Sequence, residues 1–206
     1  TDRSVTYTVT SDKAVQTLLS ASGKATMKSL GGSRYEITAN LSDTVYLVHS
    51  KTAAQLPADL TMLPFSSSWV YSSGDVTSPS SDLVPAIQVA EVKGELRQGI
   101  FAHPPAEGRC EIHYLLTLPS SGEVVFTGAV GLKKGSDDSN GVTFGIEANG
   151  KSLWSKKVTG NQSFQEFSVS LKGYAGQTVL LTLTTDAGGS NAYDLAFWGD
   201  PYLDMH

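Results

Sequence analysis

Val142-Thr143-Phe144-Gly145-Ile146-Glu147-Ala148-Asn149-Gly150-Lys151 is the stretch of sequence that decides the fold. From Val142 to Ala148 a large or apolar residue occupies every second position, and this period of two is typical of a strand with one buried face. Asn149-Gly150 follows directly, and this pair favours a hairpin turn because both residues tolerate positive φ. The stretch therefore predicts a β-strand that turns back on itself.

The same alternation recurs along most of the chain. Further alternating runs lie at residues 5–9, 35–39, 112–118, 167–171, 179–183 and 193–197. Turn-forming segments rich in Gly, Pro, Ser and Asn separate many of these runs at intervals of about 8 to 12 residues, as in β-sandwich proteins. The sequence therefore predicts an all-β sandwich.

Two segments depart from this pattern. Ser11 to Gly23 places Ala14, Val15, Leu18 and Leu19 on one helical face behind a Ser-Asp cap, so we expect a short helix there. Residues 50–86 are rich in Pro and Ser. Because a loop of that length without structure is uncommon in a compact domain, we expect this segment to carry short strands or to wrap the sandwich.

Composition limits the classes of partner. The 206 residues suffice for one large domain, or one domain and a small companion, and 40% of them are hydrophobic. A net charge of −5 gives no electrostatic reason to bind nucleic acid or an anionic membrane, and suits neutral ligands better. No run approaches the roughly 20 apolar residues of a membrane helix. The polar opening Thr1-Asp2-Arg3 is what a piece excised from a longer protein would show.

Residues typical of catalysis occur without a catalytic arrangement. His49, His103, His113 and His206 lie in no metal-binding spacing, and there is no G-x-S-x-G motif. Glycoside hydrolysis requires two convergent carboxylates, and nothing in the sequence brings two together. The single cysteine, Cys110, can form no internal disulfide, and its apolar strand pattern predicts a buried side chain.

Three segments, in order, resemble the NPCBM family of carbohydrate-binding modules. They are Gly99–Pro104, Phe126–Lys151 with its V-x-F hairpin, and Thr184–Pro201 with its Asp-Ala-Gly and Trp-x-Asp-Pro elements. The resemblance implies a galactose-binding-like jelly-roll domain at residues 43–206, with Val45-Tyr46-Leu47 as its opening strand. Residues 1–42 have no counterpart in the family and are expected to form a β-rich N-terminal extension or accessory element.

The same resemblance implies a function. It predicts a non-catalytic module that targets a secreted or cell-surface bacterial enzyme, such as a glycoside hydrolase, to galactose-type or other glycans. Its partners would be a glycan or polysaccharide and the catalytic domain of the parent protein. Leu195 and Phe197 stand where the family often carries His and Asp, and Asn149 replaces the hairpin Asp. These departures keep open a structural spacer or protein-interaction domain as the alternative. No motif in the sequence supports a third possibility, a hydrolase or lyase on the same fold.

Sugar recognition requires an aromatic platform and planar polar groups, and six residues are candidates for these roles. Trp69 and Tyr71 follow three serines and are expected to stack on a sugar ring; the alternative for Trp69 is a lid over the core. Trp154 and Trp198 are expected to pack inside the fold.

The polar candidates are His103, Arg97, Asn191 and Asp194. His103 precedes Pro104-Pro105 and therefore lies near a loop, either hydrogen bonding to sugar or satisfied by a backbone carbonyl. Asn191 and Asp194 follow the Gly188-Gly189 bend, and Arg97 offers a planar fork for adjacent hydroxyls.

One turn carries oxygen donors suited to a metal. Asp137, Asp138 and Asn140 supply hard ligands, so the cofactor suggested by the sequence is a structural calcium ion. A solvated turn has the same composition, and that alternative stays open.

Overall fold

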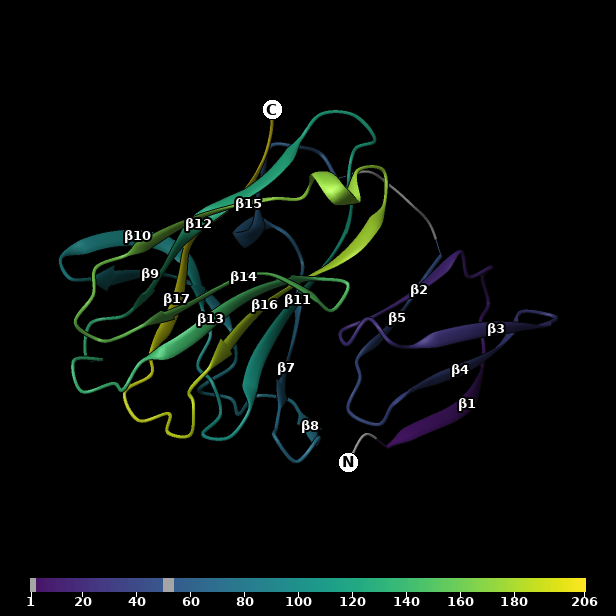
Figure 1. The fold of residues 1–206 in the computed structure, drawn as a ribbon, viewed down its shortest axis with the longest axis horizontal. Helices are drawn as coiled ribbons and strands as arrows, with labels where there is room; N and C mark the ends of the chain where they lie inside the picture. The colour runs from purple at the N-terminus through teal and green to yellow at the C-terminus, as the bar shows by residue number, and fades with distance from the viewer. Residues whose placement is uncertain (1–2, 50–53) are drawn as a thin grey trace.

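The computed structural model describes residues 3–49 and 54–206, and within them the fold is all-β, apart from two short 3-10 turns (Figure 1). The larger part is a sandwich of two sheets in which every strand pair is antiparallel. Sheet I has the order β15-β12-β17-β10-β9, with β6 paired to β17. Its strands are β6 (Ala58–Asp59), β9 (Ala86–Val92), β10 (Glu95–Phe101), β12 (Val124–Leu132), β15 (Gln165–Ser170) and β17 (Ala196–Met205).

Sheet II has the order β14-β13-β16-β11-β7-β8. Its strands are β7 (Ser66–Val70), β8 (Val76–Thr77), β11 (Arg109–Thr117), β13 (Val142–Ala148), β14 (Lys151–Val158) and β16 (Thr178–Asp186). The two 3-10 turns are η1 (Leu60–Met62) and η2 (Lys172–Tyr174). The predicted jelly-roll sandwich is confirmed.

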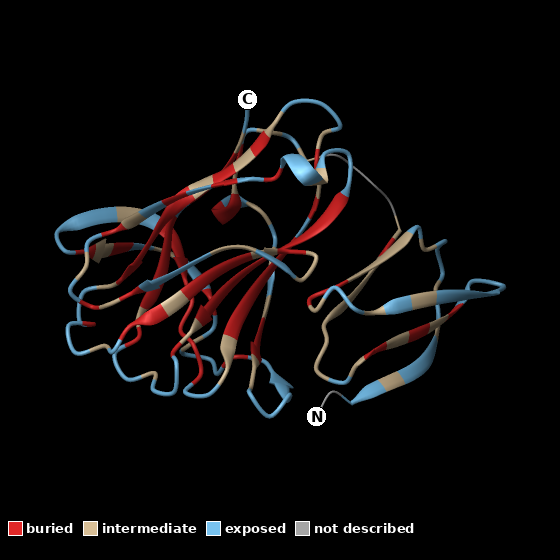
Figure 2. Ribbon diagram, viewed as in Figure 1, coloured by how far each residue is buried: buried red, intermediate tan, exposed pale blue. Residues whose placement is uncertain are grey.

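The main core lies between the two sheets and is built from the alternating residues (Figure 2). Phe144 in β13 meets Trp198 in β17 edge to face, with ring centroids 5.2 Å apart. Each fully buried Phe, Ile or Leu of this kind stabilises the fold by about 1.5–3 kcal/mol. Trp198 is fully buried, and the partly buried Trp154 packs on Phe167, so both rings pack against the core as predicted.

The quoted stretch forms the predicted hairpin between β13 and β14. Asn149 and Gly150 both adopt positive φ, 51° and 75°. The Asn149 side chain accepts a hydrogen bond from the backbone N–H of Leu180 at 2.8 Å. The residue that replaces the family's hairpin Asp therefore ties the turn to β16.

The N-terminal part forms two small sheets beside the sandwich. Its strands are β1 (Ser4–Thr10), β2 (Thr17–Ser20), β3 (Thr26–Gly31), β4 (Arg34–Asn40) and β5 (Val45–Val48), paired as β1-β4-β3 and β2-β5. The predicted helix over Ser11–Gly23 is wrong. Its Thr17–Ser20 segment pairs with β5, since the sheet partner satisfies the backbone and outweighs a weak helical pattern.

Strand β5 is not the opening strand of the sandwich, because it pairs with β2 and not with either large sheet. We therefore propose that the boundary between extension and jelly roll lies after Val48 and not at residue 43.

The extension packs on the outer face of sheet II. Its turn at Gly23 meets the hairpin turn so closely that a Cβ on Gly23 would lie 2.1 Å from the Asn149 carbonyl oxygen. Tyr46 of β5 contacts the His113 ring at 6.0 Å between centroids and hydrogen bonds to the Ser66 hydroxyl at 2.5 Å. Backbone and side-chain contacts thus hold the extension against β11, β7 and the hairpin.

Beside this junction a charged network is buried on the outer face of β11. Arg109 Nη2 lies 2.6 Å from Glu111 Oε1, and Arg109 Nη1 lies 2.7 Å from Glu147 Oε1. His113 Nε2 lies 3.2 Å from Glu111 Oε2. Burial alone would raise the pKa of Glu111, but the close contact with His113 and the charge of Arg109 outweigh it, so the pKa is lowered.

Two further sequence predictions concern local segments. From residue 54 on, the Pro- and Ser-rich segment carries β6, η1, β7 and β8, as expected; residues 50–53 of that prediction lie outside the described residues. Cys110 is buried as predicted, and burial raises the pKa of its thiol to about 12. In the described part of the chain, no helix is long and apolar enough to span a membrane.

Candidate functional site

Three connecting segments meet at one end of the sandwich, at the lower edge in Figure 1. They are residues 102–108, 133–141 and 187–195, and together they are called the rim below. Strand register places them there: Phe101 pairs with Phe197, and Leu132 with Ala196, so β10, β12 and β17 share this end. Five of the six predicted sugar-binding residues, all except Arg97, contact one another or the same backbone at this end.

His103 and Asn191 are held by one carbonyl. His103 Nδ1 lies 2.7 Å from the Pro104 carbonyl oxygen, and Asn191 Nδ2 donates to the same oxygen at 3.2 Å. His103 is buried, and this burial lowers its pKa, so the imidazole is neutral at pH 7. Of the two readings of His103 left open by the sequence, a ring satisfied by a backbone carbonyl is the one observed.

Trp69 does not form the exposed platform that we expected. The residue lies in β7 opposite Cys110, and only 9% of it is exposed. Its indole N–H donates to the His103 carbonyl at 3.0 Å, while the ring joins the main core. The expectation was wrong because Ser66–Val70 is a paired strand and not a polar loop. Tyr71 follows β7, partly buried, and meets Trp69 edge to face.

Asp194 ties two rim segments together. Its Oδ1 accepts a hydrogen bond from the Ser139 hydroxyl at 2.5 Å. The residue is fully buried, and within the described part of the chain its Oδ2 has no hydrogen-bond partner. Burial raises the pKa of Asp194. This carboxylate therefore fixes the shape of the rim and does not reach solvent itself.

Tyr193 is the rim residue that the sequence reasoning missed. The alternating run at residues 193–197 predicts a strand that includes Tyr193, but β17 begins only at Ala196. Instead, Tyr193 is 55% exposed, with φ at +63°. The left-handed conformation costs a residue with a Cβ about 1–2 kcal/mol, and residues strained in this way cluster at functional sites. The signal available in the sequence was the preceding Gly188-Gly189 bend.

Arg97 does not belong to the rim. It lies on the outer face of sheet I, where Nη2 donates to Glu166 Oε1 at 2.6 Å and Nε to Glu95 Oε1 at 2.7 Å. Its guanidinium also stacks over the Phe164 ring at 4.7 Å from the centroid. The prediction that Arg97 joins the other candidates at the loop end is wrong, because the residue sits at the opposite end of β10 from His103.

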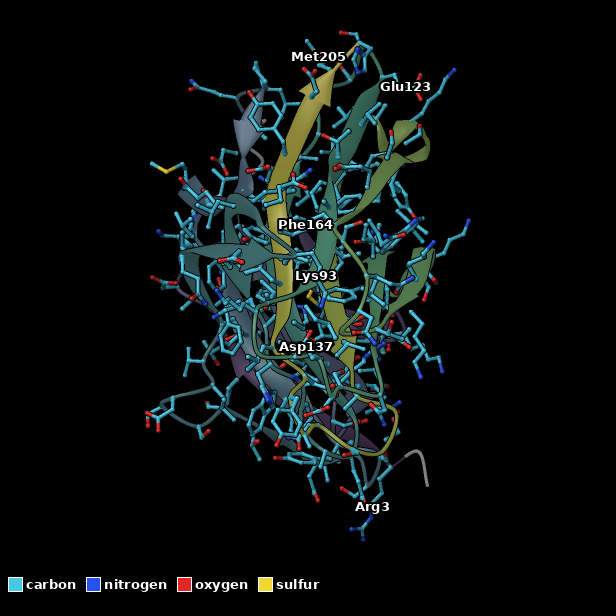
Figure 3. The ribbon with its side chains drawn as sticks, turned by 90° about the vertical axis from the view of Figure 1, so that its left-hand side faces the viewer. Arg3, Lys93, Glu123, Asp137, Phe164 and Met205 are labelled. Carbon is cyan, nitrogen blue, oxygen red and sulfur yellow. The ribbon has the colours of Figure 1, made fainter. Side chains whose placement is uncertain are left out.

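In the turn proposed for calcium, Asp137 is engaged in an ion pair. Asp137 Oδ1 accepts a hydrogen bond from Lys93 Nζ at 2.6 Å, and the two side chains lie close together in Figure 3. Asp138 and Asn140 are exposed. Across residues 3–49 and 54–206, no group of three or more His, Cys, Asp or Glu side chains is arranged to hold a metal. Calcium there stays a prediction, and binding would require Asp137 to leave Lys93.

The comparison with protein families decides the identity of the sandwich. The model of the NPCBM/NEW2 domain matches residues 58–204. The chain belongs to the NPCBM/NEW2 family. The resemblance predicted from three short segments is thus confirmed, and with it a family of carbohydrate-binding modules that are generally non-catalytic. The sequence matches no curated protein.

Solved structures similar to this NPCBM domain are CBM51 modules. The CBM51 of the Clostridium perfringens GH95 protein, in complex with methyl-galactose, is 21% identical, with a TM-score of 0.50 over 71% of this chain and 99% of that one. The tandem CBM51 modules of a Streptococcus pneumoniae family 98 glycoside hydrolase are 13% identical, with a TM-score of 0.52 over 83% and 55%.

A third structure, CBM51-2 with the INT domains of Clostridium perfringens ZmpB, is 16% identical, with a TM-score of 0.50. It matches 97% of this chain, which spans 40% of its length. At these identities the likeness establishes the fold of the NPCBM domain and not its ligand.

Proposed function

We propose that this NPCBM domain binds a terminal sugar of the galactose type at its rim and so brings an attached secreted enzyme to its glycan. The observation that carries the proposal is the family match over residues 58–204, which covers the whole sandwich. A similar module was solved with methyl-galactose, and other similar modules belong to glycan-acting or catalytic proteins. The proposed localisation is outside a bacterial cell.

The rim offers the chemistry that such binding requires. Tyr193 exposes an aromatic ring for the apolar face of a pyranose, beside the partly buried amide of Asn191. His103 and Asp194 support this surface from below through Pro104 and Ser139. In this arrangement the two buried residues position the rim, and Tyr193 and Asn191 meet the ligand.

One observation favours a second candidate, a spacer or protein-interaction domain. His103 and Asn191 both hydrogen bond to the Pro104 carbonyl, and Asp194 accepts a hydrogen bond from Ser139, so each of these three side chains already holds a bond within the rim. A spacer of the same fold would retain these bonds and lack affinity for sugars.

A glycan array with four proteins separates the two candidates. Wild type is expected to bind terminal galactosides weakly and independently of salt, since the ligand is neutral. Tyr193→Ala and Asn191→Ala are expected to lose this signal. Tyr7→Ala is the matched control because Tyr7 is an exposed tyrosine on β1, away from the rim. A wild type that retains no glycan at all would refute sugar binding and leave the spacer.

A further inference from the structure

A hollow lies on the outer face of sheet I, away from the rim. It has a volume of about 520 Å³, within the range of roughly 300–1,000 Å³ typical of small-molecule sites. Its lining comes from β6, β10, β12, β15 and β17 and comprises Asp59, Arg97, Thr127, Gly128, Glu166, Phe167, Asp200 and Tyr202. No rim segment contributes to it.

Strand alternation and one bulge create this hollow. Arg97 and Phe101 share one face of β10, and Phe101 packs in the small core cluster that includes Phe164 and Phe197, on the outer side of the sheet. The register between β12 and β17 shifts at Gly128, where a bulge separates the pair Thr127–Tyr202 from the pair Ala129–Gly199. Such bulges often re-aim side chains next to binding sites.

Arg97 organises the acidic groups around it. The guanidinium donates to Glu166 and Glu95, and its Nε lies 3.7 Å from Asp200 Oδ2. With these carboxylates around it, the arginine has little left to offer an anion. The carboxylate oxygens still free to act are acceptors, because an ionised carboxylate donates nothing. A ligand of this hollow must therefore supply donors.

The charge of the lining residues further limits the class of ligand. The lining carries the carboxylates of Asp59, Glu166 and Asp200 against the single guanidinium of Arg97, a net charge of −2. Glu95 adds another acid at the edge. An anionic sugar is repelled by this set, whereas a protonated amine is attracted and brings three donors. Tyr202, 37% exposed, provides an aromatic face beside them.

We infer that the hollow is a second saccharide subsite, separate from the rim, which takes a pyranose bearing a free amine and rejects acidic sugars. The inference concerns other strands and other residues than the proposed galactose site. Either site can therefore exist without the other.

Amide chemical-shift mapping by NMR tests the subsite with a matched pair of sugars. Glucosamine is expected to shift the amides of Thr127, Gly128 and Glu166, whereas N-acetylglucosamine, the same ring without the charge, shifts them less. N-acetylneuraminic acid is expected to leave them unmoved. Raising the salt concentration is expected to weaken the glucosamine response, since the charges are partly exposed.

Two isosteric variants test the role of charge. Glu166→Gln and Asp200→Asn each preserve shape and are expected to weaken glucosamine binding about two- to fivefold, as for a partly exposed ion pair. Asp12→Asn is the control, because Asp12 is an exposed carboxylate in the N-terminal extension.

The inference of a second subsite would be overturned if saturating glucosamine shifted no amide that lines the hollow. It would also be overturned if N-acetylneuraminic acid shifted these amides as much as glucosamine does. Rim amides that still respond to methyl-galactoside in that case would leave the proposed function intact. The reverse pattern, hollow responsive and rim silent, would support the subsite and count against the galactose site.

Discussion

Replacing Tyr193 by glycine and, separately, by alanine distinguishes the strain of its backbone from the role of its ring. Both variants remove the ring, but only alanine keeps a Cβ at the observed φ of +63°. The left-handed conformation costs a residue with a Cβ about 1–2 kcal/mol relative to glycine. Glycine loses about 0.5–1 kcal/mol more conformational freedom on folding, which offsets part of this gain. We therefore expect Tyr193→Gly to be more stable than Tyr193→Ala by up to about 1.5 kcal/mol.

Thermal unfolding measures this difference directly. A free-energy difference of about 1 kcal/mol shifts Tm by roughly 2–4 °C in a chain of this size. Tyr7, which lies in the extended strand β1, is the control, and there the order is expected to reverse because glycine weakens a strand. Affinity for the sugar is expected to fall about fivefold or more in both Tyr193 variants, from the loss of about 1 kcal/mol of ring contact.

Two results would refute the reasoning about Tyr193. An alanine variant at least as stable as the glycine variant would mean that the backbone is not strained. Unchanged sugar affinity in both variants would mean that the exposed ring serves no ligand.

Three further predictions concern the junction and the turn. Gly23→Ala is expected to loosen the extension, because the added Cβ would lie 2.1 Å from the Asn149 carbonyl oxygen. Hydrogen exchange is expected to show faster amide exchange in β5 while the sandwich stays protected. Unchanged exchange in β5 would contradict this prediction. Glu111→Gln is expected to destabilise the fold by about 2 kcal/mol in urea at pH 7. Because the folded pKa of Glu111 is lowered, the contribution of its carboxylate to stability is present at neutral pH and disappears as the pH falls through that pKa. The wild type is therefore expected to lose more stability than the variant as the pH falls. Parallel curves of unfolding free energy against pH for the two proteins would refute this. Calcium and chelator are expected to leave Tm unchanged while Lys93 holds Asp137, and a rise in Tm with calcium would establish the ion.

The sequence predicted the parts of the fold that local pattern controls. Alternation and the Asn149-Gly150 pair specified the hairpin, because strand period and turn chemistry are both local properties. The strand at Thr17–Ser20 was missed, since its partner β5 is more than twenty residues away. A pairing at that distance leaves little trace in a short window of sequence.

The candidate site was predicted only in part. Three of the predicted residues lie together at the loop end of the sandwich, as expected: His103, Asn191 and Asp194. His103 follows a strand, and the other two follow the Gly188-Gly189 bend. Trp69 turned inward because pairing with β11 made its segment a strand. Arg97 lies on a separate face, where it pairs with three carboxylates. Glu95 is on its own strand, and Glu166 and Asp200 are on β15 and β17. Such encounters depend on tertiary structure, which residue type alone does not specify.

The most direct test of the central claim is to map the amide resonances of the whole chain during titration with methyl-galactoside. The account predicts shifts concentrated in residues 102–108 and 187–195, strongest around Tyr193, and absent in the Tyr193→Ala variant. Saturating sugar that moves no rim amide, or moves only amides elsewhere, would contradict the claim that this rim binds a sugar.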